Sequence, residues 1–353
     1  MNSIGSSPRI LQIGTSVPAH SYSQAEILAE LGTIGFAQDR RTRVIFGRAG
    51  VKQRHTAIEA SFYVEPKSTE ARNDSYLEAA LPLGEAAICH SLDKAGIPPD
   101  AIDEFIVVSC TGFDIPGLDL RLAGRLGMRP DLRRMCVLGM GCYGAFPALL
   151  RAYQSTMLEK NRLVMVLALE LCSVHFQMED TLENIVSAAL FADGAATALI
   201  GSTDSQSAHA PYFINSATYC DYQTIDHMAF HVTDQGFHMQ LSAYVPDLLA
   251  ANIESFVDQF LVQNDLCRED VRLWGIHPGS SKILDYVQSR LGLSGEQMLP
   301  SRTILRDYGN MSSATILFVL DEIQRSADPR AGDYGILLGF GPGLTSEVVL
   351  LRW

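Results

Sequence analysis

A cysteine between glycines is the residue of this sequence best placed to do chemistry. Cys142 stands in the segment Gly139-Met140-Gly141-Cys142-Tyr143-Gly144-Ala145, after an apolar run and before an amphipathic helical pattern. The glycines permit a tight strand-to-helix turn, which places the sulfur at a helix N-terminus, where the dipole favours a thiolate. Most cysteines are simply small buried residues, so this motif alone leaves nucleophile and core residue equally open.

Two other polar residues stand at similar corners. His277 ends an apolar run and is followed by Pro278 and Gly279, so we expect its ring to project into a cleft. Asn310 follows Gly309, and on its own it reads as an ordinary helix cap. A Cys nucleophile with a His and an Asn from elsewhere in the chain is a recognised catalytic arrangement. The three residues together therefore favour covalent catalysis.

Short apolar runs separated by helical patterns must position these residues. The runs are typical of strands covered on both faces, and they lie at residues 10–13, 105–110, 135–138, 163–169, 195–200, 273–277, 335–339 and 348–351. Apolar stripes at helical spacing occur at residues 146–157, 283–291 and 314–323. This alternation predicts a layered α/β architecture.

The two halves of the chain repeat this order. Positions 110 and 142 are separated by 32 residues, and positions 277 and 310 by 33 residues. The similar spacing predicts a duplicated unit, with the crossover at residues 202–208. We therefore divide the chain into residues 1–205, which carry the cysteine, and residues 206–353, which carry the histidine and the asparagine.

Composition excludes several function classes. The chain has 353 residues and a formal net charge of −13, which argues against nucleic acid as a partner. Its seven cysteines show no metal-like spacing, and we expect a reducing compartment. The chain has no signal-peptide pattern and no run long enough for a membrane span, so we expect a cytoplasmic protein. We expect no metal and no bound cofactor.

The sequence resembles the type III polyketide synthases, the chalcone-synthase-like family, from about Arg9 to Trp353. The likeness rests on five motifs in order: Gly141-Cys142, Leu190-Phe191-Ala192-Asp193-Gly194-Ala195-Ala196, Ile276-His277-Pro278-Gly279, Gly309-Asn310-Met311-Ser312-Ser313-Ala314 and Gly339-Phe340-Gly341-Pro342-Gly343-Leu344-Thr345. The resemblance implies a thiolase-like fold, with duplicated α/β halves in a layered αβαβα arrangement, and a homodimer.

The resemblance also implies a mechanism. Cys142 takes an acyl group from acyl-CoA, and His277 stabilises its thiolate as an ion pair. His277 and Asn310 then donate hydrogen bonds that support decarboxylation of malonyl-CoA to an enolate, which attacks the acyl group. Phe191 corresponds to the aromatic gate of the cavity, although alone it reads as a core residue.

Other positions are assigned to substrate by the same resemblance. Arg41 and Arg48 fall on basic positions that bind CoA phosphates, whereas Val44 replaces a third basic residue. Ile115 falls where the family passes a side chain into the neighbouring subunit's cavity. Gly341 and Pro342 belong to the glycine loop that shapes the cavity.

Departures from the plant members bear on the starter. Cys110, Cys172 and His175 replace small cavity-lining threonines, and Met239 replaces a second gate phenylalanine. Ser312, near Asn310, is also expected to contact substrate. A flexible Met admits a longer apolar chain, and the set resembles bacterial members that take fatty acyl starters and release alkylpyrones or alkylresorcinols. His175 is left open as a cavity wall, a thiol partner or a structural residue.

Two rival functions are weighed against this reading. A priming β-ketoacyl-ACP synthase of fatty acid synthesis shares Cys, His and Asn but performs a single condensation. The Pro278-Gly279 turn and the glycine loop favour the polyketide reading over it. A non-catalytic partner subunit keeps only the fold, and the intact Cys142, His277 and Asn310 weigh against it.

Overall fold

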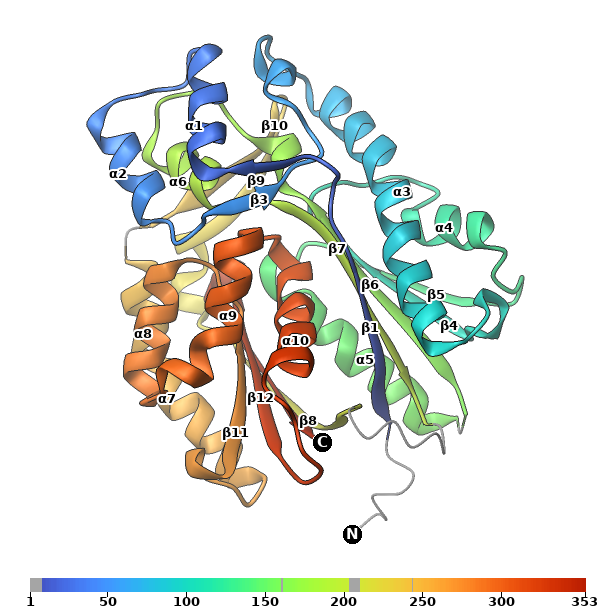
Figure 1. Ribbon diagram of the computed structural model, residues 1–353. Helices are drawn as coiled ribbons and strands as arrows, with labels where there is room; N and C mark the ends of the chain where they lie inside the picture. Colours follow the sequence, from blue (N-terminus) through green and yellow to red (C-terminus); the bar gives the residue numbers. More distant parts are fainter. Residues whose placement is uncertain (1–7, 160, 203–209, 243) are drawn as a thin grey trace.

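The computed structural model describes residues 8–159, 161–202, 210–242 and 244–353 (Figure 1). The predicted crossover at residues 202–208 falls outside them apart from Ser202, as does the predicted boundary between positions 205 and 206. No helix within these ranges is long and apolar enough to cross a membrane.

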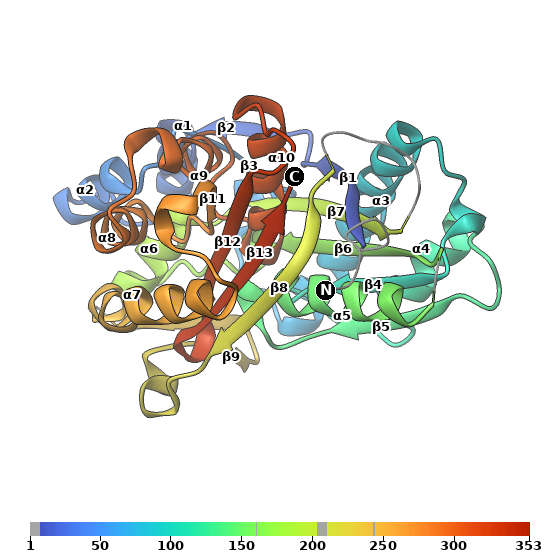
Figure 2. The ribbon, with the colours of Figure 1, turned by 90° about the horizontal axis from the view of Figure 1, so that it is seen from below.

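Nine strands of the described chain form one sheet, and each of the eight predicted apolar runs overlaps one of them. Their order across the sheet is β11 (Val271–Ile276), β12 (Tyr334–Gly341), β13 (Thr345–Arg352), β8 (Tyr212–Tyr219), β1 (Arg9–Ser16), β7 (Asp193–Gly201), β6 (Leu163–Leu171), β4 (Glu104–Val108) and β5 (Arg133–Val137). Figure 2 shows β8, β12 and β13 running at a steep angle to β4, β6 and β7.

The strand directions repeat in the two halves. In the first half β4 is parallel to β5 and β6, while β7 is antiparallel to both β6 and β1. In the second half β11 is parallel to β12, while β13 is antiparallel to both β12 and β8. The halves join through one residue pair, Arg9 and Tyr212. The predicted duplication is therefore present in the topology, although no strand in the described part of the second half corresponds to β5.

Helices make three layers around these strands. They are α1 (Gln24–Thr33), α2 (Arg40–Arg48), α3 (Thr69–Ala95), α4 (Leu118–Leu126), α5 (Ala145–Leu158), α6 (Leu182–Leu190), α7 (Val245–Gln263), α8 (Ser281–Leu291), α9 (Gly295–Tyr308) and α10 (Thr315–Ser326). The α5 and α10 helices pack between the two groups of strands, α3 and α4 cover the outer face of the first group, and α7 and α8 cover that of the second (Figure 1). This is the predicted αβαβα arrangement.

Apolar residues dictate this layering. The β6 strand is buried from Val164 to Leu171, as expected for a strand with helices on both faces. Phe146 and Leu149 of α5 lie on one stripe of their helix and are fully buried in the central layer. Two short antiparallel strand pairs lie outside the large sheet. One joins β2 (Ser21–Ser23) to β3 (Gln53–His55), and the other is the hairpin of β9 (Met228–Thr233) and β10 (Gly236–Leu241).

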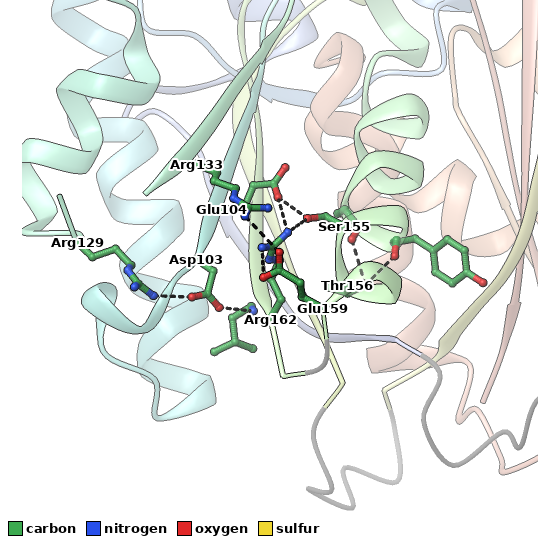
Figure 3. A network of polar contacts seen from close by, with 11 residues as sticks. Asp103, Glu104, Arg129, Arg133, Ser155, Thr156, Glu159 and Arg162 are labelled. Atoms are coloured by element: carbon green, nitrogen blue, oxygen red, sulfur yellow. Dashed lines mark hydrogen bonds and ion pairs between the residues drawn. The ribbon is translucent and has the colours of Figure 1, made fainter. Parts of the chain in front are cut away.

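A polar network fastens the amino ends of the parallel strands (Figure 3). Asp103, just before β4, accepts hydrogen bonds from Arg129 at 2.6 Å and from the Leu163 amide at 2.9 Å. Arg162, before β6, donates to Ser155 at 2.9 Å and lies 3.8 Å from Glu104. These contacts fix strand register at the end of the sheet opposite Cys110, and they leave the carboxyl ends free for a site.

Candidate active site

Backbone geometry sets the position of Cys142. The chain leaves β5 at Val137, makes a 3₁₀ turn over Gly141–Tyr143 and enters α5. Gly141 has a positive φ of 64°, and a Cβ there would lie 2.7 Å from the Pro342 ring. Glycine is therefore needed at position 141 both for the backbone conformation and for the close approach of Pro342. The Cys142 side chain is only 8% exposed.

Asn310 connects the other two predicted catalytic residues. Its Nδ2 donates to the Gly279 carbonyl at 3.3 Å, in the turn that follows His277. The amide side chain also hydrogen-bonds with the Cys142 thiol, as does Ser312. His277, just after β11, is buried and its amide donates to the Leu338 carbonyl at 2.8 Å. The structure thus brings the three residues to one place.

Burial controls the charges of this group. It raises the pKa of the Cys142 thiol to about 11, an effect that the hydrogen bonds from Ser312 and Asn310 only partly oppose and that the charge of Glu170 reinforces. It lowers the pKa of His277 to about 4. Neither ring nitrogen of His277 has a hydrogen-bond partner among the described residues. These directions favour an uncharged thiol and imidazole at neutral pH, rather than the ion pair that the resemblance implied.

A cavity of about 590 Å³ adjoins the three residues. Most of the residues predicted to contact substrate line it, namely Cys110, Cys172, His175, Phe191, Met239, Ser312 and Pro342. Gly141 and Tyr143, the chain neighbours of Cys142, line it too, although Cys142, His277 and Asn310 are not themselves lining residues. Gly341 instead packs under Tyr143, where a Cβ would lie 2.5 Å from the ring.

A buried carboxyl that sequence reasoning missed organises the inner wall. Glu170 accepts hydrogen bonds from the Cys110 amide at 3.0 Å, from Thr111 at 2.8 Å and from Ser313. The Cys110 sulfur lies 3.4 Å from Glu170 and 3.5 Å from the Ser312 hydroxyl. Burial raises the pKa of Glu170, and these hydrogen bonds oppose the rise. The signal in the sequence was a lone acid in the apolar run of β6.

The contacts of His175 assign it to the cavity wall. Its Nε2 contacts the Thr111 carbonyl at 2.8 Å, while its Nδ1 accepts from the Phe237 amide at 3.2 Å. The ring stacks on Phe237 with centroids 4.0 Å apart. Burial lowers the pKa of His175 to about 4, so the ring is neutral and Nε2 carries the proton. His175 therefore fastens the β9–β10 hairpin, which forms one side of the cavity.

An aromatic residue and a methionine complete this side of the cavity. Phe191, at the end of α6, meets Phe230 of the hairpin edge-on at 6.1 Å. The Met239 sulfur, also on the hairpin, accepts a hydrogen bond from Ser187 at 3.4 Å. Both predicted gate residues thus lie where the hairpin meets α6.

The remaining predicted residues lie outside the cavity lining. Arg41 on α2 is ion-paired with Asp180, so phosphate binding by Arg41 requires exchange of this partner. Arg48 ends the same helix, and its carbonyl accepts from Ser281 at 2.9 Å, near the turn after His277. Ile115 is 82% exposed on the outer surface.

The fold and this site define a class, the thiolase-like condensing enzymes with a Cys, a His and an Asn at one cavity. The chain belongs to the chalcone and stilbene synthase family. The pattern of that family's N-terminal domain matches residues 3–204, and the pattern of its C-terminal domain matches residues 217–353. Its homologues are condensing enzymes, type III polyketide synthases of the acyltransferase kind.

Individual relatives agree over nearly the whole chain. The sequence is 33% identical to the 1,3,6,8-tetrahydroxynaphthalene synthase of Streptomyces peucetius subsp. caesius, covering 98% of this chain and 93% of the relative. It is 32% identical to a putative chalcone synthase of Bacillus subtilis, covering 98% of each. The crystal structure of PKS-I from the brown alga Ectocarpus siliculosus superposes with a TM-score of 0.93 at 27% identity, and the match covers 100% of both chains.

Proposed function

We propose that this type III polyketide synthase condenses malonyl-CoA onto a fatty acyl starter held on Cys142 and cyclises the product to an alkylpyrone or alkylresorcinol. The observation that carries the proposal is the buried group of Cys142, Asn310 and His277 beside a largely apolar cavity. Exclusion of water from such a site strengthens every hydrogen bond to the developing enolate.

The uncharged pair fits acyl loading by general base catalysis. His277 takes the thiol proton as Cys142 attacks the thioester of the starter, and it returns that proton to the departing CoA thiolate. In the next step malonyl-CoA loses CO₂, and Asn310 stabilises the resulting enolate as a hydrogen-bond donor. The enolate carbon then bonds to the acyl carbon, and the Cys142 sulfur leaves.

Cavity size and lining support an apolar starter of medium length. A volume of about 590 Å³ holds roughly 20 non-hydrogen atoms at the ~30 Å³ that a water molecule occupies in the liquid. A pyrone ring and a chain of about ten carbons fit this space. The hairpin offers Met228, Phe230, Val232, Phe237 and Met239 to such a chain.

A compact polyhydroxylated aromatic, as in the name of the Streptomyces relative, is a second candidate product. The polar inner wall favours it, because Cys110 and Ser312 offer partners for hydroxyl groups. The two candidates differ in whether the enzyme needs an acyl-CoA besides malonyl-CoA.

Product mass spectrometry with malonyl-CoA and a panel of starters separates these functions. We expect pyrones or resorcinols from fatty acyl-CoA that disappear in Cys142→Ala and persist in Cys267→Ala, a matched exposed thiol. Products from malonyl-CoA alone support the compact aromatic. A single condensation indicates a priming synthase, and activity retained by Cys142→Ala refutes the assigned nucleophile.

We propose that Arg48 and Arg41 hold the CoA phosphates, since both residues belong to α2, whose last residue, Arg48, accepts a hydrogen bond from Ser281 through its carbonyl close to the turn after His277. None of the proposed steps requires a metal or prosthetic group, so activity is expected to survive chelators. All seven cysteines are free, which fits a reducing, cytoplasmic location.

We propose that a homodimer forms through the face around β5, the strand at one end of the sheet. This face exposes the apolar side chains Phe113, Ile115, Met135 and Leu138, and a patch of that kind marks an interface. Phe113 and Leu138 also line the cavity, so the partner would adjoin it. Light scattering should show a monomer for Ile115→Asp. Val262→Asp, a control at an exposed position of α7, should stay a dimer. A dimeric Ile115→Asp would contradict the proposal.

A further inference from the structure

A fully buried arginine lies behind the site. Arg54 on β3 is 0% exposed, and burial lowers its pKa to about 9. Its Nη1 donates to the Phe191 carbonyl at 2.7 Å, and its Nη2 donates to Gln24 Oε1 at 2.7 Å. The Nε atom has no partner among the described residues. Burying a guanidinium is costly and satisfies no requirement of packing alone.

The carbonyl that Arg54 holds belongs to the segment that holds Asn310. The Asn310 amide donates to the Leu190 carbonyl, and the Ala192 amide donates to the Asn310 carbonyl, both at 2.9 Å. Phe191 stands between these two bonds and forms a parallel bridge with Asn310. A shift of the Phe191 carbonyl therefore moves the backbone of Asn310.

Packing on the other side makes this coupling tight. Gly309, directly before Asn310, has a positive φ of 75°. A Cβ there would lie 3.1 Å from the Ala192 Cβ and 3.5 Å from the Arg54 Cβ. The backbone before Asn310 thus fits against the stem of Arg54, while the guanidinium holds the segment paired with it.

The buried acid Asp193 acts on the arginine through its charge. The charge of Asp193 opposes the fall in the pKa of Arg54. Asp193 accepts from the Ala57 amide at 2.6 Å and from the Ser173 amide at 2.8 Å. It therefore ties the chain after Arg54 to Ser173, the neighbour of the cavity residue Cys172.

We propose that Arg54 is a positioning residue for malonyl decarboxylation, which fixes the amide of Asn310 by holding the Phe191 carbonyl. The inference rests on the proposed function. Arg54 itself touches neither substrate nor the Cys142 sulfur. Its effect should fall on the step that uses Asn310 and spare the loading of Cys142.

The variant Arg54→Lys tests this, because it keeps the charge but loses the fork that reaches both acceptors. Starter loading is followed by intact-protein mass in a single turnover, and decarboxylation by CO₂ release from malonyl-CoA. We expect decarboxylation to fall about tenfold to a hundredfold, and loading to stay within about threefold of the wild type. Arg302→Lys, which alters a half-buried arginine paired with Asp285, is the matched control.

A double-mutant cycle with Asn310→Ala shows whether the effect passes through Asn310. We expect Arg54→Lys to cost less than about threefold in the Asn310→Ala background. The inference would be overturned if the double variant lost the product of the two single-variant factors. Equal losses in loading and decarboxylation in Arg54→Lys would overturn it too. If Arg54→Lys does not fold, Gln24→Met removes one acceptor of Arg54 and should show the same selective loss; equal losses in both steps there would also overturn it. A wild type that releases no CO₂ would instead overturn the proposed function.

Discussion

The protonation state of Cys142 gives the most discriminating prediction. Burial raises the pKa of this thiol to about 11, so at pH 7 only about one molecule in 10⁴ carries a thiolate. A thiol with an ordinary pKa of about 8.5 carries about 3% thiolate at that pH. Alkylation of Cys142 by iodoacetamide should therefore be limited by a thiolate population about 300-fold smaller than that of an ordinary thiol.

The slope of the pH profile is the diagnostic quantity, because burial also slows access of the reagent. Peptide mass spectrometry of Cys142 after timed alkylation from pH 6 to 10 gives the rate at each pH. We expect about a tenfold rise per pH unit up to about pH 10. N-acetylcysteine, measured in parallel, should level off above its own pKa.

A plateau in the rate between pH 6 and 8 would refute this reasoning. It would show that the charge of His277 outweighs burial and that a thiolate–imidazolium pair exists in the free enzyme. The variant His277→Ala separates the cases further. In the uncharged reading it leaves the alkylation slope unchanged, but it slows loading from acyl-CoA by about 10²–10⁴, the usual contribution of a general base.

Three further variants test the site and the fold. Asn310→Ala should lower CO₂ release from malonyl-CoA by about 10²–10³, and a loss below tenfold would contradict its role as donor. His175→Ala removes the contacts to Thr111 and Phe237 that hold the hairpin. The starter KM should therefore rise, about tenfold for each ~1.4 kcal/mol of binding free energy lost. An unchanged preference among starter chain lengths would contradict this role of His175. Burial raises the pKa of Glu347 from 4.5 to about 7, so its stabilising contribution is full below pH 4.5 and is lost as the pH rises through about 7. The Tm advantage of Glu347→Gln over the wild type should therefore grow from pH 5 to 8.5, and a constant difference would contradict this.

Much of the fold was predictable because its signals are local. Continuous apolar runs such as that of β6 indicate buried strands without knowledge of their neighbours, and the glycines around Cys142 mark the corner. The hairpin that walls the cavity was missed, since β9 and β10 are short and carry polar residues such as His231 and His238. Their alternation is too brief to stand out from a loop.

The site was only partly predictable because many of its contacts join distant positions. Glu170 reaches Ser313, and Arg41 pairs with Asp180, a residue 139 positions away. Arg54 meets the Phe191 carbonyl across 137 positions. No spacing in a single sequence marks such pairs, and the charge state of Cys142 depends on burial, which only the packed structure defines.

The difference between the two halves explains why the duplicated unit makes one site. In the first half Cys142 follows β5, a strand paired in parallel with β4. In the second half α9 precedes Asn310, and no strand takes the place of β5 among the described residues. Asn310 instead bonds through its backbone to Leu190 and Ala192 of the first half. The first half therefore supplies both the nucleophile and the support for the hydrogen-bond donor, so neither half holds a complete site by itself.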